Sequence, residues 1–277
     1  LHLSTRRQRQ MYIRDRWYII GYWRRKAGEA AFAAARLTEK SEERERYCRL
    51  AVMAGHREAC RMFCLLHPER FDGHSPHKPF KLRGIRISFY GYYYPSRYNA
   101  LLNDEQRAFC HSIYQFKQGD IHGIEFFKTC MNALQLKKRP YHIMFMPCSN
   151  WIKYGQRFKR LDWYIGKHRQ DLTSGLYDVD ICDARESLHE AKGGEKRILE
   201  RNYLITGKIK GKEIIIIDDV LTTGQSVVDY KEEIERCGGK VVAAIFYGKT
   251  FSMPSMLLVQ IHIWGNHIAH IIERMTK

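Results

Sequence analysis

The stretch that most constrains the fold spans residues 214–226 and reads IIIIDDVLTTGQS. Four consecutive isoleucines are typical of a central strand in a parallel sheet, because such a strand is buried on both faces. Open α/β sheets bind their ligands at the carboxyl edge, where each strand ends. Asp218 and Asp219 follow the isoleucines directly. The pattern therefore predicts an α/β fold with a ligand site at the end of this strand.

The residues after the two carboxylates predict an anion site. Residues 222–226 form a turn that opens a helix, and a helix N-terminus presents free N–H groups and partial positive charge. Gly224 allows close backbone approach, and hydroxyl groups add donors, so the turn suits a phosphate. Two nearby carboxylates suit vicinal sugar hydroxyls. The alternative is a plain strand end with Thr222 as the helix N-cap.

Other segments of the last 140 residues support a parallel sheet. HIMFMP is a candidate buried strand, and the following helix places Phe158, Leu161 and Ile165 on one face. QSVVDYKEEIERC is typical of a helix, and KVVAAIFYG of a further strand. Strand, helix and strand in this order form a βαβ unit, whose two strands are parallel. We expect SMLLVQIHIWG to add another strand.

The upstream half has a different composition. Residues 10–66 have helical periodicity that is interrupted at Gly55-His56, which predicts a helical hairpin. The segment RYCRLAVMAGHREACRMF within it resembles one unit of the Sel repeat family. Residues 66–81 are typical of a linker, a β-prone aromatic segment follows, and residues 104–136 are predicted to be helical. Tyr92, Tyr93 and Tyr94 would form either a base-stacking platform or packed sheet.

We therefore expect three regions: a basic helical region over 1–75, an aromatic and helical connecting region over 76–139, and an α/β domain over 140–277.

No segment is long and apolar enough for a membrane span, and no signal-peptide h-region follows the basic start. Eight scattered cysteines, none in a C-x-x-C pair, favour reduced thiols in a cytoplasmic protein.

Positive charge is concentrated in two segments. The net charge is +17, and residues 1–26 and 137–169 together hold seventeen basic residues against two acids. Clustered positive charge predicts a polyanionic partner, either nucleic acid (DNA or RNA) or a phosphorylated substrate. The alternative is a solvated basic face without a specific partner. The candidate nucleic-acid residues are Arg14, Arg16, Arg24, Arg25, Lys26, Arg157, Lys159 and Arg160.

IIIIDDVLTTGQS resembles the phosphoribosyl-pyrophosphate (PRPP) motif of type I phosphoribosyltransferases, and the resemblance extends over roughly residues 141–250. It is closest to the ComF-type, competence-associated members. FMPCSN resembles their pyrophosphate loop, GQRFKRLDWYIG their basic aromatic helix, and DARESLHEAKGGEKRILERNYLI, in part, their hood. The resemblance implies a phosphoribosyltransferase-like parallel sheet flanked by helices, here joined to a mainly α-helical N-terminal region. The cysteine zinc finger usual in ComF-type members is absent from this sequence.

The resemblance also implies roles for individual residues. Asp218 and Asp219 would be the catalytic pair that binds the ribose hydroxyls. Ser149 and Asn150 would face the pyrophosphate, with Mg²⁺ held through the substrate and not by a side-chain cluster. The 5-phosphate would be bound by Thr222, Thr223, Gly224, Gln225 and Ser226. The hood candidates are Arg185, Arg197, Arg201 and Asn202.

Three functional hypotheses follow. The first is an enzyme that binds PRPP or a nucleotide with Mg²⁺ and displaces or cleaves at the anomeric carbon, with nucleic acid held by the basic regions. The second is a nucleic-acid-docked effector of a retron-like anti-phage defence system, with a reverse transcriptase as protein partner and toxicity through nucleotide depletion. The third is a non-catalytic DNA-binding module that senses PRPP or a nucleotide.

Overall fold

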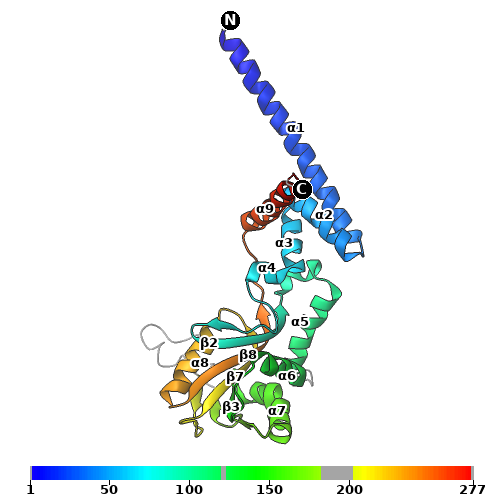
Figure 1. Ribbon diagram of the computed structural model, residues 1–277. Coiled ribbons are helices and arrows are strands. Elements are labelled where there is room, and N and C mark those ends of the chain that lie inside the picture. Colours follow the sequence, from blue (N-terminus) through cyan, green and yellow to red (C-terminus); the bar gives the residue numbers. More distant parts are fainter. Residues whose placement is uncertain (1, 120–122, 182–201, 276–277) are drawn as a thin grey trace. The chain divides into compact units, whose positions relative to one another are not determined.

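The computed structural model describes residues 2–119, 123–181 and 202–275 of the chain. The chain divides into two compact units (Figure 1). The first contains Leu1–Gly73, Ala100–Leu102 and Ser252–Lys277, and the second contains His74–Asn99 and Asn103–Phe251. No helix among the described residues combines the length and the apolar character that a membrane crossing requires.

The first unit is helical. It contains α1 (His2–Leu37), α2 (Ser41–Met53), α3 (Arg57–Leu66), α4 (Pro68–Asp72) and α9 (Met256–Met275). The predicted helical hairpin is confirmed: α2 and α3 pack together, and the Nδ1 atom of His56 caps α3 by accepting a hydrogen bond from the Ala59 backbone N–H at 3.2 Å. Cys48, Ala51 and Phe63 are buried between the helices.

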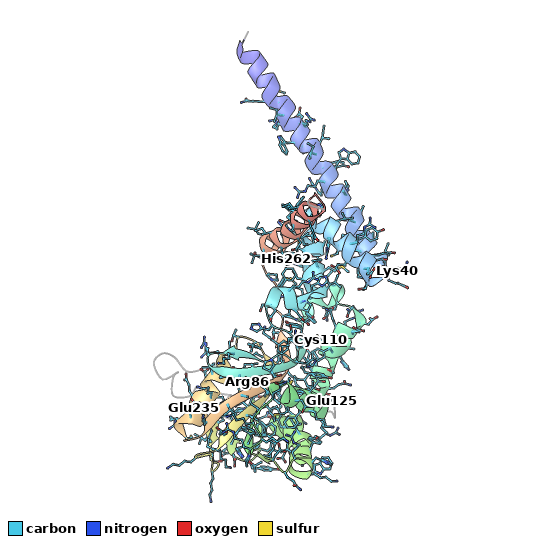
Figure 2. The ribbon with its side chains drawn as sticks, in the orientation of Figure 1. Lys40, Arg86, Cys110, Glu125, Glu235 and His262 are labelled. Carbon is cyan, nitrogen blue, oxygen red and sulfur yellow. The ribbon has the colours of Figure 1, made fainter. Side chains whose placement is uncertain are left out.

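The strand expected near residues 255–265 is instead part of helix α9, so that prediction is wrong. Val and Ile are frequent in strands, but here the buried Val259 and Ile263 are spaced four residues apart, which places both on one helix face. α9, which carries His262 (Figure 2), packs on α2 and α3. The His262 ring lies 5.4 Å from the Phe71 ring, centroid to centroid. Tertiary packing thus overrides the local β preference.

The second unit is built on a six-stranded sheet of order β1-β2-β8-β7-β3-β4. Its strands are β1 (Phe80–Leu82), β2 (Ile85–Tyr93), β3 (Tyr141–Phe145), β4 (Leu172–Ser174), β7 (Glu213–Leu221) and β8 (Lys240–Thr250). All neighbours are parallel except β1 and β2. The short strands β5 (Val179–Ile181) and β6 (Tyr203–Ile205) pair separately. The predicted mainly parallel α/β fold is confirmed.

Two crossovers leave adjacent strands in opposite directions. β3 continues through α7 (Trp151–His168) to β4, whereas β7 continues through α8 (Gln225–Arg236) to β8 on its other side. Because parallel crossovers are right-handed, the two helices cover opposite faces of the sheet. The strand order therefore reverses between β3 and β7, and a crevice at the carboxyl ends of such a strand pair is the usual ligand position.

The connecting region supplies part of this sheet and its covering layer. β1 and β2 extend the sheet beyond β8, and α5 (Asp104–Lys117) and α6 (Gly123–Leu134) pack on β2. Tyr92 and Tyr94 are each only 5% exposed, so these two rings are packed in the core and are not an open stacking platform. His74–Asn99, which include most of the aromatic segment, are thus a structural part of the second unit, whereas residues 66–73 of the predicted linker belong to the first.

Candidate ligand site at the carboxyl end of β7

Asp218 and Asp219 lie where β7 passes the end of its neighbour. β3 pairs with β7 as far as Phe145 opposite Ile217, and the Met146 backbone N–H then donates to the Ile217 carbonyl oxygen at 2.9 Å. Asp218 is therefore the first β7 residue beyond β3, although pairing with β8 continues to Leu221. All four preceding isoleucines are fully buried, as predicted for a central strand.

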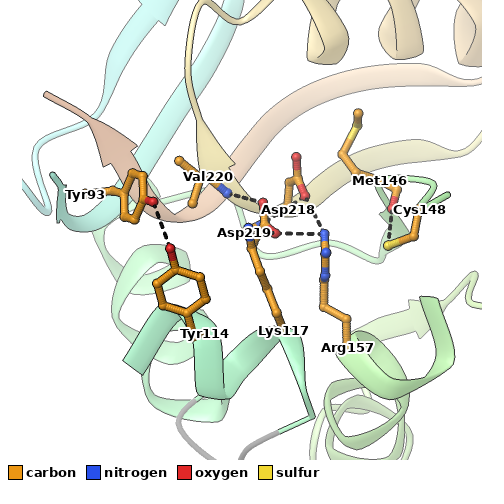
Figure 3. Close-up of polar contacts among 9 residues, drawn as sticks. All are labelled: Tyr93, Tyr114, Lys117, Met146, Cys148, Arg157, Asp218, Asp219 and Val220. Atoms are coloured by element: carbon orange, nitrogen blue, oxygen red, sulfur yellow. Dashed lines mark hydrogen bonds and ion pairs between the residues drawn. The ribbon is translucent and has the colours of Figure 1, made fainter. Parts of the chain in front are cut away.

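Two cations from different helices contact the acidic pair (Figure 3). Arg157 of α7 places Nη1 at 2.8 Å from Asp219 Oδ2 and 3.7 Å from Asp218 Oδ1. Lys117, the last residue of α5, places Nζ at 3.2 Å from Asp219 Oδ2. The side chains of the two aspartates and Arg157 are between 11% and 17% exposed, so these charges are largely removed from water. The site is thus a compact set of two acids and two bases.

The two carboxylates differ in their environment. Burial raises the pKa of Asp218 to about 8, and the adjacent Asp219 charge adds to this effect, while Arg157 opposes it. The Asp219 backbone N–H donates to Asp218 Oδ1 at 2.7 Å, and the Val220 N–H donates to Asp219 Oδ1 at 2.6 Å. These bonds fix both carboxyl groups on the strand. The bond from the Asp219 N–H also lowers the Asp218 pKa, but burial and the Asp219 charge outweigh this effect.

The turn after β7 has the form predicted for an anion site. Gly224, at φ 79°, is the N-cap of α8, and Thr222, Thr223 and Ser226 are exposed around it. A Cβ atom at Gly224 would lie 2.3 Å from Cδ2 of Leu82, so the close packing of β1 also requires glycine. The exposed hydroxyls and the free N–H groups at the start of α8 can therefore meet a phosphate.

Gln225 is held by two side chains. Its Nε2 donates to Asp229 Oδ1 at 2.6 Å, and its Oε1 accepts from Arg83 Nη1 at 2.7 Å. Arg83 thus adds a cation beside the turn, from the hairpin between β1 and β2. Nothing in the sequence around the turn indicates Arg83, because it lies about 140 residues away along the chain.

The loop after β3 lies beside the acidic pair and contains two predicted residues, and a third contacts it from outside the loop. Asn150 is the N-cap of α7, where its Oδ1 accepts from the Lys153 backbone N–H at 2.9 Å, and the half-buried Ser149 precedes it. Asn202 donates from Nδ2 to the Cys148 carbonyl oxygen at 2.9 Å. Burial raises the pKa of the Cys148 thiol to about 11, so this cysteine remains protonated at neutral pH.

A small cavity of about 220 Å³ adjoins the site along α5. Tyr93 and Tyr114 contribute to its lining, and their hydroxyl oxygens lie 3.3 Å apart beside Lys117 (Figure 3). This hydrogen bond, together with burial, raises the pKa of Tyr93 to about 12. His111 and Asn99 add polar atoms to the lining. The sequence offered no indication of this cavity, because it joins two segments of the connecting region.

The structure separates the residues that the sequence analysis grouped as basic. Lys159 and Arg160 are exposed on α7, whereas Arg157 on the same helix turns toward the carboxylates. Arg157 therefore belongs to the candidate ligand site around Asp218 and Asp219. The hood candidates Arg185, Arg197 and Arg201 lie outside the described residues.

No cluster of three or more His, Cys, Asp or Glu side chains suited to a metal ion occurs within residues 2–119, 123–181 and 202–275. The adjacent Asp218 and Asp219 carboxylates do offer the oxygen ligands that Mg²⁺ prefers. Mg²⁺ in such sites is commonly bound by one or two carboxylates together with substrate phosphates. The donor set thus fits a metal that arrives with a phosphorylated ligand.

Comparison with known proteins indicates a family for part of the second unit. Residues 170–250 match the family model described as phosphoribosyl transferase domain. The matched segment runs from β4 to β8, so it includes Asp218 to Ser226 and excludes the β3 loop and α7. The mainly parallel sheet, the carboxylates at the end of β7 and this match together define a phosphoribosyltransferase-like α/β domain.

A curated relative gives the same indication. Over 57 residues the chain is 42% identical to an orotate phosphoribosyltransferase of Sulfolobus acidocaldarius. The aligned segment covers 20% of this chain and 26% of that enzyme, so the match spans about a quarter of the relative's length. It supports the type I phosphoribosyltransferase family. The resemblance to ComF-type members stays a prediction.

Proposed function

We propose that this protein binds PRPP or a nucleotide and displaces or cleaves the substituent at the anomeric carbon of the sugar. The observation that carries the proposal is the Asp218–Asp219 pair at the strand-order reversal, followed directly by the Gly224 turn and the N-terminus of α8. Carboxylates would accept hydrogen bonds from the ribose 2- and 3-hydroxyls. The turn would hold the 5-phosphate through N–H and hydroxyl donors.

The two cations give the site a way to select a charged ligand. In the protein alone, Arg157 contacts both aspartates and Lys117 contacts Asp219. A sugar that carries a pyrophosphate would supply hydroxyl donors to the carboxylates and a polyanion to the cations. Both cations could then move a short distance to the leaving group, where positive charge stabilises the developing negative charge. A neutral sugar carries no polyanion to which the two cations could move.

Ser149 and Asn150, in the loop between β3 and α7, would contact the pyrophosphate. When bound with the substrate, Mg²⁺ would supply charge neutralisation of the leaving oxygens, with Asp218 and Asp219 as its protein ligands. The cavity beside Tyr93 and Tyr114 is the place that we assign to the acceptor, because it adjoins the carboxylates from the side of α5. Its small volume favours a single-ring compound.

The test is calorimetric titration of PRPP and, separately, of a nucleotide, each with Mg²⁺, into protein freed of nucleic acid. Wild type is compared with the double variant Asp218→Asn, Asp219→Asn, and circular dichroism confirms that both are folded. We expect binding by wild type and a loss of at least tenfold in affinity in the variant. A folded wild-type protein that does not bind PRPP or a nucleotide would refute the proposal.

Nucleic-acid contact is the second part of the proposal, and the surface of α1 favours it. Trp17, Tyr18 and Trp23 are between 65% and 75% exposed, and Arg14 and Arg16 are exposed near them. Exposed aromatic rings interleaved with arginines suit single-stranded nucleic acid, in which bases stack on rings and phosphates meet cations. Arg24, by contrast, donates to the Met53 carbonyl oxygen, and Lys26 pairs with Glu29.

The effector and sensor hypotheses make different predictions from simple catalysis. A toxic effector that depletes nucleotides would arrest growth on expression, and the Asp218→Asn, Asp219→Asn variant would relieve the arrest. A sensor would bind PRPP or a nucleotide without turnover. Co-purification of a reverse transcriptase with the tagged chain would test the protein partner that the defence hypothesis requires.

A further inference from the structure

A larger cavity lies at the opposite edge of the sheet from Asp218 and Asp219. Its volume is about 640 Å³, within the roughly 300–1,000 Å³ of small-molecule pockets. It is formed by the end of α6, the segment leading into β3 and the segment between α7 and β4. All of its lining residues belong to the second unit. The proposed phosphoribosyltransferase function does not use this cavity.

The lining combines an apolar wall with a cationic rim. Met131, Leu136 and Tyr141 supply apolar surface, and Lys137 and Lys138 are exposed beside them. Four cations line the cavity in total, against one acid, Asp171. Both Asp171 oxygens are engaged by Arg169, through Nε at 2.8 Å and Nη2 at 2.8 Å. The cavity therefore has an excess of positive charge.

Two of the cations are arginines fixed in position. Arg139 Nε lies 2.6 Å from Glu213 Oε2, and its guanidinium stacks over the Tyr141 ring at 5.6 Å. Arg169 stacks over the Phe127 ring at 5.9 Å in addition to its pair with Asp171. A guanidinium carries five N–H donors, so each arginine retains donors for a ligand after these contacts. Fixed guanidinium groups lose little entropy when they bind phosphate.

The geometry points to a second ligand site in this cavity, for a phosphorylated ring compound of mononucleotide size. The phosphate would meet Lys137, Lys138 and the two arginines. The ring would lie on the apolar wall that Met131, Leu136 and Tyr141 form. A free phosphate would leave this wall in contact with water, and an extended nucleic acid would follow the exposed basic face of α7 instead of entering a concave site.

The experiment uses the full chain with Asp218→Asn and Asp219→Asn, so that the candidate ribose site does not contribute. Adenosine and uridine 5′-monophosphate and inorganic phosphate are titrated into this protein by calorimetry. We expect at least one nucleotide to bind, and to bind more than tenfold tighter than phosphate. Adding Lys137→Gln and Lys138→Gln should weaken this binding at least tenfold, whereas adding Lys208→Gln and Lys210→Gln, two exposed lysines elsewhere, should not change it.

Several results would overturn the inference. One is the absence of binding by either nucleotide at millimolar concentration. Another is equal affinity for inorganic phosphate, and a third is binding that the Lys137→Gln, Lys138→Gln change leaves unaltered. A fourth is a single-stranded oligonucleotide that binds more tightly than the nucleotides and whose binding falls as much with Lys159→Gln and Arg160→Gln as with Lys137→Gln and Lys138→Gln. This result would make the cavity part of a nucleic-acid surface. Thermal melts of the variants identify any loss of folding, which exposed lysines are not expected to cause.

Discussion

Arg157 Nη1 lies 2.8 Å from Asp219 Oδ2, so a residue that was predicted to contact nucleic acid lies against the acidic pair (Figure 3). This contact joins α7 to β7 across the point where the strand order reverses. The guanidinium also lies 3.7 Å from Asp218 Oδ1, which makes Arg157 the common partner of both carboxylates. The ion pair is therefore a structural element of the protein as well as part of its proposed site.

Replacing Arg157 by Gln should destabilise the protein. Exposed ion pairs contribute about 0–1 kcal/mol, whereas breaking a buried pair costs about 3–5 kcal/mol, and this pair is 11–17% exposed. We expect the free energy of unfolding at pH 8 to fall by about 2 kcal/mol in urea denaturation. Arg160→Gln, an exposed change on the same helix, is the control and should stay within about 0.5 kcal/mol of wild type. Equal effects of the two changes would contradict this role of Arg157.

The raised pKa of Asp218 predicts a pH dependence of stability. Between the ordinary value of 3.8 and about 8, the folded protein holds a proton on Asp218 that the unfolded chain has released. The free energy of unfolding therefore declines as pH rises through this window. Asp218→Asn removes the titration, so its stability relative to wild type should rise by more than about 1 kcal/mol between pH 5 and pH 8. Asp15→Asn, a change at an exposed residue, is the control. Parallel curves of unfolding free energy against pH for Asp218→Asn and wild type would argue against the raised pKa of Asp218.

Gly224→Ala should damage both the fold and the phosphate turn. Its φ of 79° is unfavourable for alanine, and the new Cβ would lie 2.3 Å from Leu82 Cδ2. We expect a loss of about 1–3 kcal/mol in the free energy of unfolding, with weaker PRPP binding. Gly166→Ala in α7 has open space around it and should stabilise the helix by up to about 1 kcal/mol. Leu82→Ala in the Gly224→Ala background would remove the clash but not the φ strain, so it should restore only part of the stability.

The sequence was sufficient to predict the features that depend on short stretches. Ile214 to Ile217 indicated the buried strand, the spacing of Phe158, Leu161 and Ile165 indicated the face of α7, and Gly55-His56 indicated the helical hairpin. The acidic pair and the turn that follows it lie within one such stretch. Their place at the carboxyl edge followed from their position directly after the strand.

The features that the sequence did not reveal depend on contacts between distant segments. Lys117 reaches Asp219 across about 100 residues, and Arg83 reaches Gln225 across about 140 residues. Arg157 was expected on the basic surface, because charge clustering does not show which residue of a helix faces inward. A strand was expected over residues 255–265, because Val and Ile are frequent in strands. The packing of α9 on α2 and α3, which decides for a helix, is not visible in the sequence.

Asp218 is expected to make the protein less stable as pH rises, whereas His142 should make it less stable as pH falls. Its ring is buried, with Nε2 at 2.6 Å from Asp178 Oδ2 and Nδ1 at 2.7 Å from Thr173 Oγ1, and Lys212 Nζ lies 3.5 Å from Nδ1. Burial and the Lys212 charge lower the pKa of His142 despite the attraction of Asp178. The unfolded chain therefore binds a proton below about pH 6.5 that the folded protein does not bind, and stability is lost as pH falls through that value.

His142→Gln should remove this acid-dependent loss. It should also lower the free energy of unfolding by about 2 kcal/mol at pH 8, because buried hydrogen bonds to Asp178 and Thr173 are lost or distorted. Denaturation at pH 5 and pH 8 measures both effects. The exposed His111→Gln change is the control. A His142→Gln variant that loses as much stability as wild type between pH 8 and pH 5 would show that His142 does not titrate in this way.

The exposed arginines of α1 predict a measurable electrostatic signature if the chain binds single-stranded nucleic acid as proposed. Each phosphate that a cation neutralises contributes about −0.7 to the slope of log K against log salt concentration. Arg14→Gln with Arg16→Gln should therefore make the slope less negative by about 1.4, as measured by fluorescence anisotropy with a labelled oligonucleotide between 50 and 300 mM salt. Lys208→Gln with Lys210→Gln removes the same charge from the second unit and should leave the slope unchanged. If both double variants alter the slope equally, overall charge and not α1 determines the binding.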